Sequence, residues 1–257
     1  MEPGAAREML LREAARYFTA QEFLTRAPSP GWVGYEEGRL GAASRYFPLV
    51  GLVVGLFAAL VYWLADWTVG STFAAVAALG AMTWLTGALH EDGFADCCDG
   101  LGGASDRTRA LEIMRDSRIG VYAAIGLIIL FALKWSALSA ISEGAVAALL
   151  IAPIVSRAAM TQILCFGHYT RDDGAARDVA GIVSLQEAVI ALAIAAFFAL
   201  AIGGGAGLLA LIVAFACAGL WLWRVTARLG GYTGDVIGAA EQIAQVAVFA
   251  TLAALWS

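Results

Sequence analysis

Seven long apolar stretches dominate this chain and restrict it to a membrane-embedded fold. Each contains 18 to 23 residues, and about 20 apolar residues span a bilayer as a helix. Backbone groups in lipid must be hydrogen-bonded within the chain, so we predict an all-α, polytopic bundle of about seven transmembrane helices. The stretches are residues 47–65, 68–89, 119–141, 145–166, 185–202, 206–223 and 239–256.

The composition excludes several other classes of protein. Hydrophobic residues make up 61% of the 257 residues and charged residues 14%, against about 25% charged in soluble domains. The net charge of −5 provides no basic field for nucleic acid, so no nucleic-acid partner is expected. The four cysteines lack metal-ligand spacing, and we interpret them as small packing residues.

The N-terminal segment, residues 1–46, differs from the rest of the chain. It has no apolar core typical of a signal peptide, and roughly residues 5–25 place charged and apolar side chains on different faces of a helix. We predict an amphipathic helix that lies on the membrane surface or caps the bundle. Residues 1–257 are therefore expected to form one integral membrane domain, with 1–46 cytoplasmic and 47–257 as the transmembrane bundle.

The basic residues predict the orientation of the chain. Fourteen of the 16 Lys and Arg residues lie in the N-terminal segment and in every second loop, while the alternate loops and the C-terminus have none. Because cytoplasmic loops are enriched in basic residues, we predict a cytoplasmic N-terminus and an external C-terminus in a bacterial inner membrane. Lys134 and Arg157 fall inside spans, and we expect Lys134 to snorkel toward the outer surface.

A row of aspartates follows the second apolar stretch. Asp92, Asp96 and Asp99 are spaced i, i+4 and i+7, which places them on one face of a helix continuing from that span. Like charges at this spacing repel one another unless a cation joins them. Since Mg²⁺ is held by a few carboxylates together with substrate phosphates, the row predicts a metal site, with a solvated helix end as the alternative.

A second polar cluster lies close behind. Glu112 and Asp116 form an i, i+4 pair beside Arg115 and Arg118. One interpretation is that the carboxylates complete the metal site while the arginines hold phosphate. An ordinary loop helix with internal ion pairs explains the pattern equally well.

Three other polar positions are candidates with open alternatives. Arg157 within a span faces either a salt-bridge partner or a substrate. Arg171 lies in a cytoplasmic polar segment, and Asp235 ends a glycine-rich turn suited to close backbone approach to a ligand. The pattern at Asp235 alone favours a turn without a ligand.

Together these segments resemble the cobalamin (5′-phosphate) synthases, the adenosylcobinamide-GDP ribazoletransferases. The resemblance covers nearly the whole chain and is carried by 47–51, 90–100, 111–120, 156–157 and 230–239. The chain departs from the family pattern at Glu91, where an apolar residue is usual, and at Gln242 and Gln245, where glutamates are usual.

The resemblance implies an enzyme that joins adenosylcobinamide-GDP to α-ribazole or its 5′-phosphate, releases GMP and requires Mg²⁺. It implies a metal at Asp92, Asp96 and Asp99 and arginines on the pyrophosphate, drawn from Arg118, Arg157 and Arg171. Asp116 is the candidate acceptor for the hydroxyl proton. The oligomeric state stays open.

Two other functions compete with this one. The CDP-alcohol phosphotransferases share aspartates on membrane helix ends, but the Ala-Arg pair expected after Asp99-Gly100 is absent here. A transporter would carry charged residues through its spans and on both sides of the bilayer. Here nearly all charged residues gather on one side, which favours an enzyme acting on cytoplasmic substrates.

Overall fold

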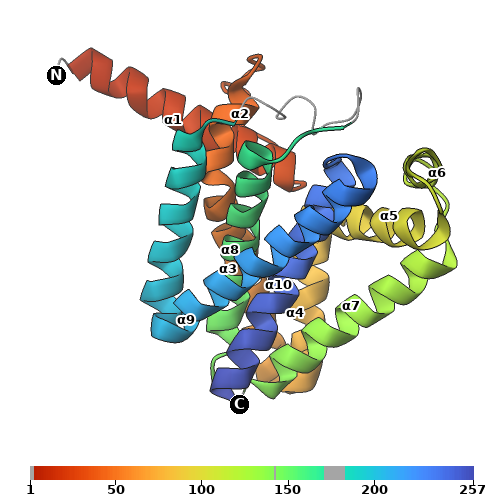
Figure 1. Cartoon of the computed structure of the whole chain (residues 1–257). Helices are drawn as coiled ribbons and strands as arrows, with labels where there is room; N and C mark the ends of the chain where they lie inside the picture. The colour runs from red at the N-terminus through yellow and green to blue at the C-terminus, as the bar shows by residue number, and fades with distance from the viewer. Residues whose placement is uncertain (1–2, 142, 171–182) are drawn as a thin grey trace.

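The computed structural model describes residues 3–141, 143–170 and 183–257, and within these ranges the chain is a helical bundle (Figure 1). Apart from one isolated bridge between Tyr169 and Tyr232, the described residues form no strand. The predicted all-α class is confirmed. The helices are α1 (Pro3–Leu24), α2 (Arg39–Ala43), the 3-10 helix η1 (Ser44–Tyr46), α3 (Phe47–Thr68), α4 (Ser71–Thr86), α5 (Leu89–Gly103), α6 (Arg107–Ile113), α7 (Val121–Ala140), α8 (Ala145–Phe166), α9 (Leu185–Leu229) and α10 (Gly234–Trp256).

Five helices among the described residues are long and apolar enough to cross a membrane: α3, α7, α8, α9 and α10. With 45 residues α9 is too long for one crossing, and it breaks at Gly204, whose φ of 56° and ψ of −137° are non-helical. A Cβ added at Gly207 would meet the carbonyl of Ala199, a contact that residues eight apart in a straight helix cannot make. The two arms of α9 therefore form a hairpin, as the predicted fifth and sixth spans require.

The prediction for the second span, residues 68–89, is wrong at its C-terminal end. Helix α4 stops at Thr86, and Gly87 and Ala88 both adopt left-handed backbone conformations. Helix α5 then leaves at 93° to α4, so the aspartate row lies across the end of the bundle and does not continue the span (Figure 1). Counting the bent pair α4–α5 as one span and α9 as two gives seven, the predicted number.

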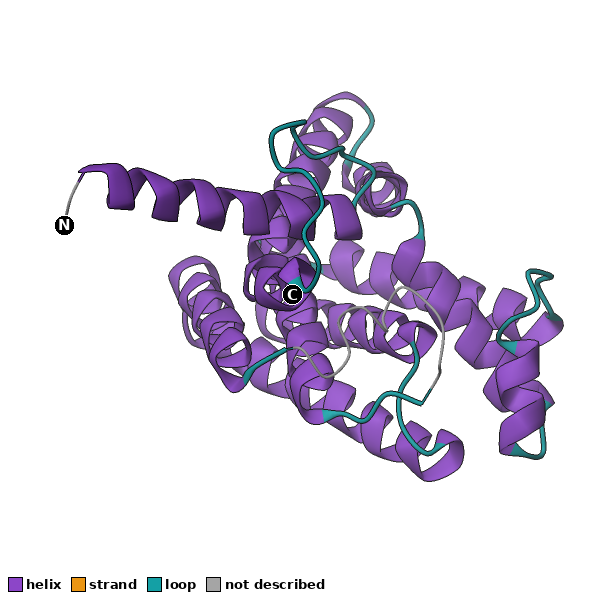
Figure 2. Ribbon diagram, turned by 90° about the horizontal axis from the view of Figure 1, so that it is seen from above, coloured by secondary structure: helices purple, strands orange, loops and turns teal. Residues whose placement is uncertain are grey.

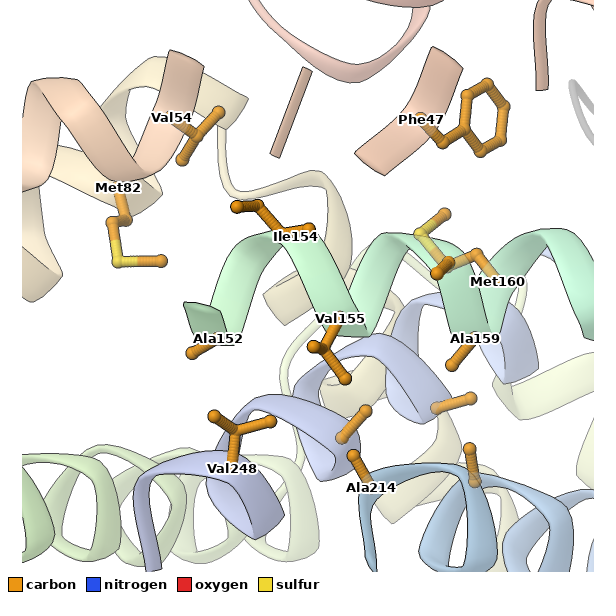
Figure 3. Packing of buried hydrophobic residues seen from close by; sticks show 14 of the residues in the cluster. Phe47, Val54, Met82, Ala152, Ile154, Val155, Ala159, Met160, Ala214 and Val248 are labelled. Carbon is orange, nitrogen blue, oxygen red and sulfur yellow. The ribbon is translucent and has the colours of Figure 1, made fainter. Parts of the chain in front are cut away.

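Helix α8 lies at the centre of the bundle, and most of its residues are buried. Figure 3 shows Ile154 and Val155 of α8 among Val54 of α3, Ala214 of α9 and Val248 of α10. Glycine allows the closest helix contact: a Cβ at Gly51 would overlap the Pro153 carbonyl, and one at Gly55 would lie 2.7 Å from the Leu149 oxygen. Small residues at such positions let backbones approach, which stabilises helix pairs in lipid.

The N-terminal helix α1 confirms that the segment predicted to be an amphipathic helix is helical. It projects beyond the bundle, at the end of the molecule that also holds α5 and α6 (Figures 1 and 2). Its C-terminal half is anchored, because Glu13 accepts a hydrogen bond from Tyr46 and lies 3.7 Å from Arg45, which itself pairs with Glu187 of α9. The C-terminus of the chain lies at the opposite end (Figure 1).

Candidate active site

A cavity of about 420 Å³ lies between α5, the segment that follows α6, and the first turns of α7. The 93° bend before α5 turns the aspartate row toward this segment, so both polar clusters predicted from the sequence line one space. The cavity is lined by acidic and basic side chains from both: Glu91, Asp92, Asp96, Asp99, Arg115, Asp116 and Arg118. Asp92 is exposed, whereas Asp96 and Asp99 are half-buried.

Asp99 joins α5 to α7. Its carboxylate accepts hydrogen bonds from the backbone N–H groups of Gly120, at 2.6 Å, and Ala123, at 2.9 Å. These groups lie at the N-terminus of α7, where helix amides lack partners and the helix dipole favours negative charge. Asp99 therefore holds one wall of the cavity against the other, in addition to the metal role predicted for it.

Glycine explains how closely α5 approaches α10. A Cβ at Gly93 would lie 2.8 Å from the Cα of Asp235, so only glycine permits this contact. Asp235 itself is half-buried in the first turn of α10, where its side chain lies 3.3 Å from the Thr233 hydroxyl. It is thus brought beside α5 but does not line the cavity.

Asp116 and Arg118 form an exposed pair at the cavity. The Arg118 side chain donates to both carboxylate oxygens at 2.5 to 3.1 Å, and its backbone N–H donates to the same group at 3.1 Å. The hydrogen bond from the Arg118 side chain is the main cause that lowers the pKa of Asp116 to about 2. A general base works best with a pKa near the operating pH, so Asp116 is a weak proton acceptor in this conformation.

Two other predicted site residues lie away from the cavity. Glu112 is exposed on α6, pairs with Arg109 at 3.0 Å and does not line the cavity. Arg157 is fully buried within α8 and pairs with Glu241 of α10 at 3.0 Å, which matches the salt-bridge alternative for this residue. The prediction for Arg171 lies outside the described residues.

A buried polar network around Glu241 was not predicted. Glu241 accepts from Arg157, from the Ser156 hydroxyl at 2.7 Å, and from the side-chain amides of Gln245 and Gln242. The same two amides accept hydrogen bonds from Lys134 of α7 through their oxygens. Lys134 is only 2% exposed, so the prediction that it snorkels to the outer surface is wrong. The available signal was the charged and amide residues inside apolar spans, which in membranes mark paired or functional positions.

The chemistry of the cavity suits a polyanionic substrate that arrives with a divalent cation. Its carboxylate oxygens are the donors that Mg²⁺ prefers, and its arginines match phosphate. Among the described residues no three His, Cys, Asp or Glu side chains form a ready-made metal cluster. Asp92, Asp96 and Asp99 therefore line one cavity without converging on one point, and a Mg²⁺ ion there would need substrate phosphates and water as ligands besides one or two carboxylates.

Comparison with known proteins agrees with the motifs. Residues 16–253 match the family model of cobalamin-5-phosphate synthase. A protein named adenosylcobinamide-GDP ribazoletransferase from Leptothrix cholodnii is 41% identical over 96% of this chain and 98% of its own length. A protein of the same name from Ralstonia nicotianae is 42% identical over 95% of this chain and 97% of its own length. One from Shewanella frigidimarina is 37% identical over 95% of this chain and 96% of its own length. No solved structure matches. The chain belongs to the cobalamin-5-phosphate synthase family.

Proposed function

We propose that this chain transfers the adenosylcobinamide phosphate moiety of adenosylcobinamide-GDP to α-ribazole or α-ribazole 5′-phosphate, and that GMP is released. The observation that carries the proposal is that Asp92, Asp96, Asp99, Arg115 and Arg118 line one and the same cavity in a chain of this family. The names of its relatives describe the same reaction class.

In this reaction a hydroxyl of the ribazole attacks the phosphorus that carries the cobinamide. A new P–O bond forms while the P–O bond to GMP breaks, and the hydroxyl releases its proton. Charge on the oxygens of the pyrophosphate must be stabilised as GMP leaves, which is the main task of a phosphoryl-transfer site. Arg115 and Arg118 line the cavity, and we assign them to these oxygens, since a guanidinium matches phosphate with two parallel hydrogen bonds.

The aspartate row is the part of the cavity that would hold Mg²⁺. When bound, the ion supplies charge neutralisation at the pyrophosphate. The Asp99 carboxylate already accepts two backbone amides of α7, so we assign Asp99 to the rear of the ion site and Asp92 and Asp96 to the closest approach. Because Arg118 keeps Asp116 ionised, we assign Asp116 to the orientation of Arg118 rather than to proton transfer.

We further propose that the cavity faces the cytoplasm of a bacterial cell. The support is the arginine-containing N-terminal helix α1, which lies at the same end of the bundle as α5 and the basic helix α6 (Figure 1). Both substrates are charged or strongly polar, and this side gives them access without crossing lipid.

The test is the release of GMP by the purified protein in lipid nanodiscs. Incubation with adenosylcobinamide-GDP, α-ribazole and Mg²⁺ should yield GMP and the joined corrinoid in equal amounts, both measured by mass spectrometry. Omission of α-ribazole should stop GMP release. GMP release that is independent of α-ribazole would indicate a hydrolase, and release of CMP from a CDP-alcohol in place of this reaction would indicate the competing phosphotransferase class.

A further inference from the structure

Four buried charged side chains, two cations and two carboxylates, come from four different helices. Lys134 of α7 and Arg157 of α8 are 2% and 0% exposed, and Glu91 of α5 and Glu241 of α10 are 7% and 0% exposed. Charges inside a membrane bundle are costly unless they are balanced. Within the described residues, the other Asp, Glu, His, Lys and Arg side chains buried to this degree are His90, which lies 3.8 Å from Glu241, and Glu187, which pairs with Arg45 elsewhere.

The direct contacts neutralise only one of the two cations. Arg157 touches the Glu241 carboxylate, whereas the hydrogen bonds described for Lys134 go to the oxygens of Gln242 and Gln245. Both glutamines donate to Glu241, so Glu241 already accepts from Arg157, Ser156 and two amides. Lys134 is therefore hydrogen-bonded by neutral groups and needs a second carboxylate to balance its charge.

Glu91 is the carboxylate that remains. One of its oxygens accepts from the Thr83 hydroxyl of α4 at 3.0 Å, and the other is buried without a hydrogen-bond partner. Its chain neighbour His90 lies 3.8 Å from the Glu241 carboxylate, which brings this turn of α5 to the buried network. From there the charge of Glu91 acts on Lys134 and Arg157. Glu91 also lines the cavity, next to Asp92 in the chain. It thus connects the buried charges to the helix that carries the aspartate row.

We propose that Glu91 is a positioning residue: its charge balances Lys134 and thereby holds α5, with Asp92, Asp96 and Asp99, against α7. This proposal rests on the proposed function only for the experiment that measures turnover. The balance of charge and the position of α5 are testable without substrate.

The first experiment is a double-mutant cycle of thermal stability in nanodiscs with Glu91→Gln, Lys134→Met and the double variant. Glu91→Gln keeps the shape of the side chain and its hydrogen bond to Thr83, but it leaves Lys134 unbalanced. Each single variant should melt several degrees below the unchanged protein, and the double variant should lose less than the sum because neutrality is restored. Additive losses would overturn the proposal.

A matched control is Asp92→Asn, which removes the same charge from the adjacent residue of the same helix. Asp92 is exposed and lies outside the buried network. Its effect on melting should be independent of Lys134→Met. If Asp92→Asn couples to Lys134→Met as strongly as Glu91→Gln does, the coupling is a general field effect and the specific role of Glu91 is refuted.

The second experiment reports the position of α5 directly. A Cβ added at Gly126 of α7 would lie 2.6 Å from the Sγ of Cys98 of α5, which places the thiol of a Gly126→Cys variant within reach of a disulfide. Copper–phenanthroline oxidation should join the two thiols, and Cys98→Ser should prevent this. Glu91→Gln should lower the yield several-fold and Lys134→Met in the same chain should restore it; an unchanged yield with Glu91→Gln would refute the positioning role.

Turnover completes the test. GMP release at saturating substrate should fall on the order of tenfold in Glu91→Gln and recover in the double variant, because a displaced aspartate row misaligns the reacting groups. A double variant that recovers stability but not turnover would overturn the proposal, because Glu91 or Lys134 would then serve turnover by a route other than charge balance. If the unchanged protein releases no GMP, the proposed function fails, and the melting and cross-linking results still decide the role of Glu91.

Discussion

Asp96 occupies the middle of the aspartate row. The substitution Asp96→Asn keeps the shape of the side chain and removes its charge, so it distinguishes an effect on catalysis from an effect on stability. We predict that Asp96→Asn lowers GMP release at least a hundredfold, because charge stabilisation at the pyrophosphate is lost. Stability should change by no more than about 0.5 kcal/mol, since repulsion within the row is relieved. The matched control is Glu112→Gln on α6, outside the cavity, which should retain most turnover. Equal losses in both variants would place Glu112 in the site after all.

Arg157 supports a second prediction at the scale of single residues. Arg157→Met leaves Glu241 buried without its charge partner, which typically costs about 3–5 kcal/mol. Arg157→Lys keeps the charge and should be milder, and neither variant should raise the KM for adenosylcobinamide-GDP in the folded fraction. Thermal melting measured beside steady-state kinetics checks this. A raised KM with unchanged melting would favour substrate contact by Arg157.

At the scale of elements, the contact between α3 and α8 depends on glycine. We predict that Gly51→Ala destabilises the protein by about 1–3 kcal/mol, because its Cβ would overlap the Pro153 carbonyl and force the two helices apart. Gly80→Ala in α4 is the matched control, since a Cβ there meets no atom within 4 Å. That substitution should be neutral or stabilise by up to about 1 kcal/mol through helix propensity. The melting temperatures of both variants test the contact. An equal loss of stability in the two variants, or a larger loss in Gly80→Ala, would contradict it.

At the scale of the whole molecule, we predict that the chain crosses the membrane seven times, so that the two ends of the bundle lie on opposite sides. A single thiol introduced by Ser257→Cys in a cysteine-free background should react with an impermeant maleimide in intact cells. A thiol introduced by Ser105→Cys, an exposed position before α6, should react only in inverted vesicles. Reaction of both thiols from the same side would refute the seven-span arrangement.

The sequence by itself determined the class of fold and most helix boundaries. Apolar runs of about 20 residues leave the backbone no alternative to helices in lipid, so α8 coincides with the predicted span 145–166. The gap at residues 203–205 between the fifth and sixth predicted spans correctly located the break of α9 at Gly204. The spacing of the aspartates and the arginines after them also identified the residues that line the cavity.

Only the tertiary structure decided how these parts meet. The bend at Gly87 and Ala88 depends on left-handed backbone angles that hydropathy cannot reveal, and it turns α5 by 93°. The partners of Lys134 and Arg157 lie on α10, 111 and 84 residues further along the chain, so spacing could not pair them. Local sequence determines which segments enter the membrane, because the partition of each segment into lipid depends on its own hydrophobicity. The burial of a charged side chain depends on neighbouring helices, which only the assembled bundle provides.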